Sequence, residues 1–195
     1  MDLKNELTKQ LMDDNSVKAL SKTSGAKPKQ VETIINAAVP MLLQGMRSNA
    51  SSSKGAESLL GALTSHAGDD TSDIGAFLEK ADINDGSKIL GHLLGGSKEK
   101  IETGIAKKTG TSDKQVSDIL SSLAPALLSL MGSKTQETGT KADGLGGLVG
   151  NLLGGDDDGF GLDDIAELLL SGKGKGKKTS SAGSLLSAIG NLFDD

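Results

Sequence analysis

The stretch PKQVETIINAAVPMLLQGM occupies residues 28–46, and the stretch DKQVSDILSSLAPALLSLM occupies residues 113–131. A shift of 85 residues, which carries Gly25 onto Gly110, places the second stretch on the first without a gap. The residues that recur at the shifted positions are Lys22, Gly25, Lys29, Gln30, Val31, Ile34, Pro40, Leu42, Leu43, Met46 and Ser48. A tandem duplication explains this match more simply than shared composition does, and the period suits a small domain used twice.

Both stretches have the hydrophobic periodicity of a long amphipathic helix. Apolar residues recur at three- and four-residue intervals over residues 31–46, and the same pattern returns over residues 116–131. A proline interrupts each helix, at Pro40 and at Pro125. By this periodicity each proline falls opposite the apolar stripe, so we expect a kink that bends the helix around the core.

Shorter helices are predicted on either side of these two. The first unit should open with helices at residues 3–12 and 17–23, the second of which ends at Gly25. Further apolar pieces lie at residues 57–65, 73–80 and 87–94, and then at 144–153, 162–170 and 184–193. None shows the alternation typical of strands. The predicted fold class is all-α, with two tandem duplicated helical units, residues 1–96 and 97–195, that contain helix-turn-helix-like elements.

The composition excludes several kinds of protein. The 195 residues contain no Cys, Trp or Tyr, which rules out disulfide scaffolds, thiolate metal sites and Cys nucleophiles. The N-terminus lacks the apolar core of a signal peptide, and no apolar run approaches the ~20 residues that span a bilayer. We therefore expect a soluble, cytoplasmic protein with no membrane span.

The formal net charge of −5 is unevenly distributed. Residues 1–54 carry +3, residues 55–96 carry −5, residues 97–134 carry +2 and residues 135–195 carry −5. Each half thus begins mildly basic and ends acidic. This alternation is either random surface charge or a source of head-to-tail attraction between modules, within or between chains.

A helix, a glycine and a second helix at this spacing are typical of a helix-turn-helix. The residues at the motif positions are Ser21, Gly25, Val31 and Ile34 in the first copy and Ala106, Gly110, Val116 and Ile119 in the second. A nucleic-acid reader would present Lys27, Lys29, Gln30 and Thr33, or Ser112, Lys114 and Gln115, to bases and phosphates. Phosphate binding needs a strongly basic face, whereas these regions carry only +3 and +2.

Glycine recurs every fourth residue in two of the short apolar pieces. These glycines are Gly91 and Gly95 in the first half, and Gly146, Gly150 and Gly154 in the second. A glycine face lets two helices approach closely because it removes side-chain bulk. The glycines therefore indicate either close contacts inside a small core or a surface that docks onto another copy of the chain.

No constellation of residues indicates catalysis. His66 and His92 are far apart, and neither belongs to a pair with metal-ligand spacing. The acidic run at residues 156–159 fails the register of a calcium loop. The run Gly172-Lys173-Gly174-Lys175-Gly176-Lys177-Lys178 is typical of a flexible basic linker. The sequence predicts no catalytic residue, no cofactor and no metal ligand.

One segment carries a family resemblance. Residues 85–96 read Asp-Gly-Ser-Lys-Ile-Leu-Gly-His-Leu-Leu-Gly-Gly, and with residues 101–131 they resemble a bacterial family named only as domain of unknown function 937, the YidB-like group. The resemblance implies an all-helical bacterial protein with a homeodomain-like arrangement, and it supplies no catalytic residue. Our leading hypothesis is a non-enzymatic self-association or scaffolding protein, whose partner is itself or another protein. The alternative is a helix-turn-helix nucleic-acid-binding protein.

Overall fold

The computed structural model describes residues 3–152, and these residues contain helices and no strand. The α-helices are α1 (Leu3–Leu11), α2 (Asp14–Ser24), α3 (Pro28–Ala50), α4 (Ser53–His66), α5 (Ile74–Lys80), α6 (Ile83–Leu94), α7 (Lys98–Thr109), α8 (Asp113–Thr138) and α9 (Leu145–Leu152). Two short 3₁₀ turns, η1 (Gly95–Ser97) and η2 (Ala142–Gly144), precede α7 and α9. The prediction of an all-α chain is confirmed for the described residues. The pieces predicted at residues 162–170 and 184–193 lie outside them.

The two quoted stretches form the longest described helices, and a glycine precedes each one. Gly25 ends α2 at φ +72°, and Gly110 ends α7 at φ +65°. This left-handed conformation costs glycine little, so the chain can turn sharply into α3 and α8. The succession of helix, left-handed glycine and helix therefore occurs at both positions. The repeat of whole units stays a prediction.

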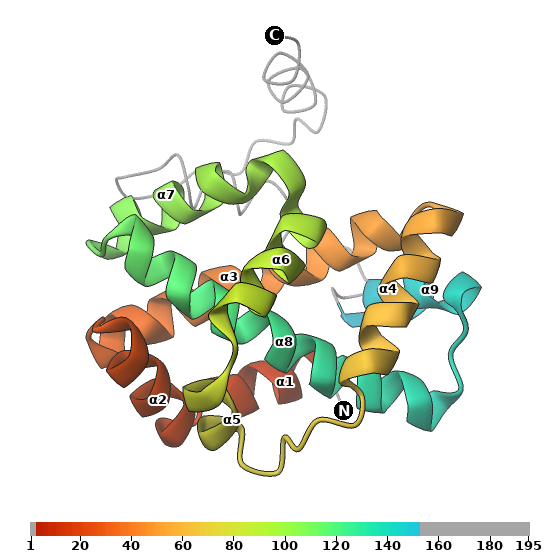
Figure 1. Cartoon of the computed structure of the whole chain (residues 1–195), viewed down its shortest axis with the longest axis horizontal. Coiled ribbons are helices and arrows are strands. Elements are labelled where there is room, and N and C mark those ends of the chain that lie inside the picture. Colours follow the sequence, from red (N-terminus) through yellow and green to blue (C-terminus); the bar gives the residue numbers. More distant parts are fainter. Residues whose placement is uncertain (1–2, 153–195) are drawn as a thin grey trace, which may run out of the picture. The chain divides into compact units, whose positions relative to one another are not determined.

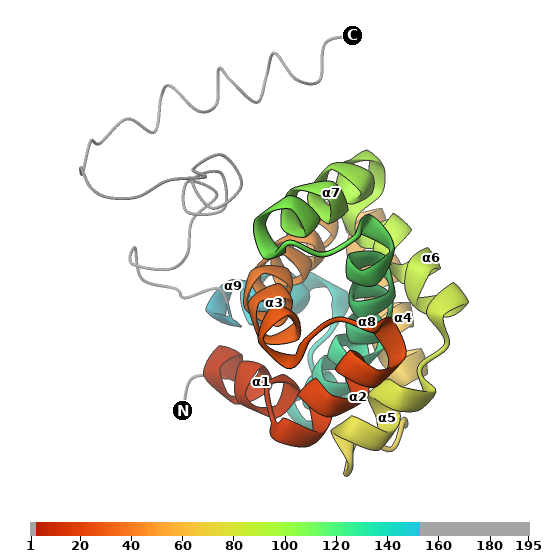
Figure 2. The same cartoon turned by 90° about the vertical axis from the view of Figure 1, so that its left-hand side faces the viewer.

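α3 and α8 lie at the centre of the described helices, and the shorter helices pack around them (Figures 1 and 2). α4, α6 and α7 all pack against α8, and α9, α4 and α6 pack against α3. Helices from both sides of residue 96 therefore share one core, and all described residues belong to one compact unit. The division into units 1–96 and 97–195 stays a prediction about the repeat in the sequence.

The expected position of the two prolines was wrong. Pro40 and Pro125 are both buried, within runs of consecutive buried residues at 37–43 and 119–129. An amphipathic helix on the surface buries one stripe, whereas a central helix is covered on several sides. The serines Ser121, Ser122 and Ser129 of α8 are buried as well, which hydrophobic periodicity does not predict.

Pro125 explains how α6 docks on α8. A proline has no N–H, so the carbonyl of Ser121, four residues earlier, loses its helical donor. Gly86 of α6 lies against this carbonyl, and a Cβ added there would overlap its oxygen and carbon atoms. Only glycine lets the α6 backbone come this close. The contact places the start of α6 on the middle of α8.

Two further glycines hold the outer helices against the central ones. A Cβ added at Gly45 of α3 would lie 2.8 Å from the carbonyl oxygen of Leu93 in α6. A Cβ added at Gly132 of α8 would overlap the carbonyl oxygen of Leu63 in α4. Close backbone contacts thus fix α6 at both ends and α4 near its end. In Figure 1, α4 and α6 lie on the same side of α8.

α8 is long and apolar enough to cross a membrane by length and composition alone, although no such segment was predicted from the sequence. In that apolar window, 78% of the helix is buried inside the described structure. Such burial is expected of the core helix of a folded domain, whose apolar side chains contact other helices.

The glycine contact at Gly86 generates a stability prediction. Gly86→Ala should lower the free energy of unfolding by roughly 3 kcal/mol, because the backbones of α6 and α8 must move apart. Gly61→Ala is the matched control, since Gly61 lies in α4 with nothing within 4 Å of an added Cβ, and it should stabilise the chain by about 0.5–1 kcal/mol. Chemical denaturation followed by circular dichroism measures both. Equal effects at the two sites would contradict the close contact.

Candidate functional site

The predicted nucleic-acid contacts lie at the starts of α3 and α8, where two glutamines have structural roles. Gln30 Oε1 accepts a hydrogen bond from the backbone N–H of Lys27 at 3.0 Å. Gln30 Nε2 donates to the carbonyl oxygens of Thr109 and Gly110, both at 3.1 Å. Gln30 therefore caps its own helix and also binds the turn that precedes α8.

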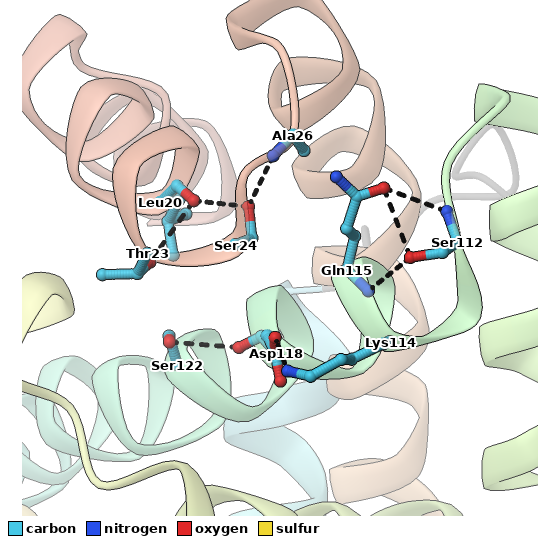
Figure 3. A network of polar contacts seen from close by, with 9 residues as sticks. All are labelled: Leu20, Thr23, Ser24, Ala26, Ser112, Lys114, Gln115, Asp118 and Ser122. Carbon is cyan, nitrogen blue, oxygen red and sulfur yellow. Dashed lines mark hydrogen bonds and ion pairs between the residues drawn. The ribbon is translucent and has the colours of Figure 1, made fainter.

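Gln115 occupies the matching position in α8. Its Oε1 accepts a hydrogen bond from the backbone N–H of Ser112 at 3.0 Å, and the backbone N–H of Gln115 donates to Ser112 Oγ at 3.2 Å. Its Nε2 lies 3.8 Å from a Cβ added at Gly25, in the turn that precedes α3. Figure 3 shows the Gln115 side chain between Ser112 and the chain at Ala26. Each glutamine thus reaches the glycine turn of the other copy.

The predicted lysine contacts differ between the two copies. Lys27 and Lys29 are exposed at the start of α3. Lys114 is also exposed, and its Nζ lies 2.5 Å from Asp118 Oδ2 one turn along α8 (Figure 3). α3 exposes Lys29, Glu32, Thr33 and Asn36 on one face. At the matching positions of α8, Lys114 is exposed, Ser117 and Asp118 are half-buried, and Ser121 is buried. A face for reading bases is therefore open on α3 and only partly open on α8.

The predicted self-association glycines lie away from the close helix contacts. Among the described residues, an added Cβ meets nothing within 4 Å at Gly91, Gly95 or Gly150, and at Gly146 it meets only the carbonyl oxygen of Ala50 at 3.9 Å. Gly154 lies outside the described residues. Within the described residues the close helix contacts are therefore made by other glycines, among them Gly86.

A groove of about 650 Å³ lies between α4 and α6. Leu59, Leu93 and Leu128, all buried, form its floor. Ala62 of α4 and Ile89 of α6 line its sides, and Lys54 and His92 are exposed at its edge. We call this depression the apolar groove.

A second depression, the acidic cleft, has a volume of about 540 Å³ and lies at the C-terminal end of α4 and the start of α6. Its carboxylates are Asp69, Asp70, Asp73, Asp82 and Asp85. Two of them also cap helices: Asp73 accepts from Ala76 N–H, and Asp82 from Asn84 N–H. Two hydrogen bonds from Ser72 lower the pKa of Asp70 below its ordinary value. The bond from the Ser72 hydroxyl has the larger effect, and the bond from the Ser72 backbone N–H has the smaller one.

His66 of α4 lies between two carboxylates of this cleft. Its Nδ1 is 2.9 Å from Asp69 Oδ2, and its Nε2 is 3.8 Å from Asp85 Oδ2 in α6. Ser129 of α8 donates to Asp69 Oδ2 at 2.8 Å. The serine binds the aspartate and not the histidine, so the geometry is that of a polar cluster that joins three helices. Among the described residues, no group of three or more His, Cys, Asp or Glu side chains could hold a metal ion.

The two depressions follow one another along α4, α6 and α8. Pro125 lines the acidic cleft and Leu128 the apolar groove, and three residues along a helix correspond to about 4.5 Å. Both depressions have walls from α4 and α6. We call the two together the α4–α6 valley. It is acidic at one end, apolar along its middle, and edged by Lys54 and His92 at the other end.

Residues 3–134 match the model of the family described as "Bacterial protein of unknown function (DUF937)". The chain belongs to this family. No curated protein and no solved structure matches the chain. The resemblance predicted from residues 85–131 is thereby confirmed.

The DUF937 match contains every residue that lines the α4–α6 valley, and it contains both glutamine caps. The glycines of α9 and the basic run at residues 172–178 lie beyond its end. The valley is therefore a feature of the DUF937 region of this chain.

The polar cluster and the valley were not predicted from the sequence. His66 and Ser129 are separated by 63 positions, and no short-range pattern joins them. One signal was present, because five aspartates between residues 69 and 85 supply most of the negative charge of residues 55–96. The sequence shows the net negative charge of residues 55–96, but the concentration of that charge in one cleft depends on how α4, α5 and α6 pack.

A buried carboxylate in the DUF937 chain was also missed. Glu102 of α7 is 8% exposed, and its Oε1 has no hydrogen-bond partner, with Lys98 Nζ at 3.9 Å. The 85-residue shift places Glu102 on Val17, an apolar core residue that is 5% exposed. The carboxylate of Glu102 thus occupies a position that is apolar in the first copy.

Replacement of this carboxylate should stabilise the chain. Glu102→Met is expected to raise the free energy of unfolding by about 1 kcal/mol, because an apolar side chain of similar size needs no buried partner. Glu99→Met, at an exposed position of the same helix, is the matched control and should change stability by less than about 0.5 kcal/mol. Urea denaturation measures both variants. A loss of stability in Glu102→Met would show that Glu102 makes a favourable interaction.

Proposed function

We propose that this chain is a non-enzymatic helical protein that associates with further copies of itself, as a scaffold, through the α4–α6 valley and the outer face of α6 at Gly91. The observation that carries the proposal is the apolar groove between two helices, whose floor is formed by three buried leucines. A helix from another molecule can bury its apolar face in such a groove.

The open glycine of α6 offers a second surface. Gly91 lies two residues, or about 200° around the helix, from Ile89, so it faces away from the groove. It is exposed, and among the described residues nothing lies within 4 Å of a Cβ added there. No part of the described chain uses this space, so a helix from a second molecule can approach the α6 backbone there. The chain has few aromatic residues, and assembly would add buried apolar area that a small core lacks.

Nucleic-acid binding is the second candidate, and one observation favours it. α3 exposes Lys29, Thr33 and Asn36 on one face, next to Lys27. Three observations weigh against it: Gln30 is bound to the turn before α8, Lys114 is paired with Asp118, and the matching face of α8 is only partly exposed. The basic charge of these regions is small, so we rank this function second.

Bulk at the open glycine of α6 should weaken assembly. Gly91→Leu is expected to leave the fold intact, because among the described residues nothing lies within 4 Å of an added Cβ, and to weaken self-association roughly tenfold or more by blocking close approach. Gly61→Leu is the control, since it adds the same bulk at an open position of α4 outside the valley. Sedimentation equilibrium of the full chain measures the effect. An unchanged association constant for Gly91→Leu would exclude the α6 face.

Charge reversal tests the second candidate. We expect weak binding of a mixed-sequence DNA duplex at physiological salt, with no further change in Lys29→Glu or Lys114→Glu, because neither copy presents a strongly basic face. Fluorescence anisotropy across a salt series is the measurement. Tight, salt-sensitive binding that is lost in both variants would place nucleic-acid binding first.

A further inference from the structure

We propose that the occupant of the α4–α6 valley is the C-terminal segment, residues 172–195, of a second copy of this chain. The inference rests on the proposed self-association and names the surface and the segment through which it occurs. Residues 172–195 lie outside the described residues, and their sequence matches the geometry of the valley in three respects.

The charges of the segment match those of the valley in order. The segment begins with Lys173, Lys175, Lys177 and Lys178, continues with an apolar stretch, and closes with Asp194 and Asp195. The valley begins with the five carboxylates of the acidic cleft, continues with the apolar groove, and ends at Lys54 and His92. A segment that lies along α6 in the same direction therefore meets an opposite charge or an apolar surface at each step.

The carboxylates of the acidic cleft are not all neutralised by the described chain. Asp70 is exposed and bonds only with Ser72, and Asp73 and Asp82 bond with backbone N–H groups at helix starts. Lys80 is the one lysine among the residues that line the cleft. Four lysines from another molecule would supply the cations that these side chains lack.

The apolar part of the segment has the pattern that a groove between two helices accepts. Leu185, Ile189 and Leu192 recur at intervals of four and three residues, beside Leu186 and Phe193, which is the spacing of one helix face. Ten residues in a helix extend about 15 Å, the same length as α6 between Asp82 and His92. The leucine floor of the groove would receive this face.

The connecting chain is long enough to reach another molecule. About 20 residues separate Leu152, the last described residue, from Gly172, and they span at most roughly 65 Å when fully extended. Exchange of C-terminal segments between two copies would bury both grooves in a closed dimer, with the same contact made twice.

Cysteine cross-linking tests the proposal on the full chain, which contains no native Cys. One chain carries Ser58→Cys at the edge of the apolar groove, and a second, with a different mass tag, carries Asn191→Cys. In a thiol–disulfide buffer the mixture should form a cross-linked heterodimer roughly tenfold faster or more than free collision allows. Thr64→Cys, also exposed on α4 but outside the valley, replaces Ser58→Cys in the control and should lack this enhancement.

A charge variant adds a second test. Substitution of Lys173, Lys175, Lys177 and Lys178 by Glu in the chain that carries Asn191→Cys should slow cross-linking roughly tenfold at low salt, and added salt should shrink the difference. Because these substitutions lie outside the helical core, thermal unfolding of that core should not change.

The outcomes separate this inference from the proposed function. Equal cross-linking rates at Ser58→Cys and Thr64→Cys in a chain that still self-associates would overturn the inference and leave the proposed function standing. A chain with both Ser58→Cys and Asn191→Cys that cross-links as a monomer would show the segment in its own valley, which also overturns it. A full chain that stays monomeric and forms no cross-link would overturn both.

Discussion

The contact between Gly86 and the Ser121 carbonyl is the constraint on which the arrangement of the outer helices depends. Pro125 removes the N–H that would bind this carbonyl in an uninterrupted helix, and only a residue without a Cβ lets α6 approach it. Gly45 and Gly132 make comparable contacts with α6 and α4. With both helices held close to α8 in this way, the space that remains between them is the α4–α6 valley.

The sequence predicted the helices well because their signals are local. The periodicity at residues 28–46 and 113–131 predicted α3 and α8, and Gly25 and Gly110 predicted their starting turns, since each signal lies within the element it defines. The burial of Pro40 and Pro125 was not predicted, because periodicity identifies an apolar stripe but cannot say how many neighbours cover a helix. The close contacts at Gly86 and Gly132 were missed for the same reason.

The candidate site was harder to predict because its residues come from distant segments. Gln30 was read as a base contact from its place at a helix start, yet its side chain binds a turn 80 residues away. His66 has no partner within a short window of sequence other than Asp69. Asp85 reaches His66, and Ser129 reaches Asp69, only once α4 and α6 lie on α8. Charge counting located the acidic region at residues 55–96, and the fold concentrates it at one end of the valley.

The central claim is that the surface between α4 and α6 is used by another copy of the chain. Sedimentation equilibrium of the unmodified full chain, over a wide concentration range and at low and high salt, tests this most directly. The account predicts a dimer or larger assembly whose association weakens as salt rises. Salt screens the attraction between the charges of the valley and the opposite charges of the segment from the second copy. A folded chain that remains monomeric at every concentration and salt would contradict it.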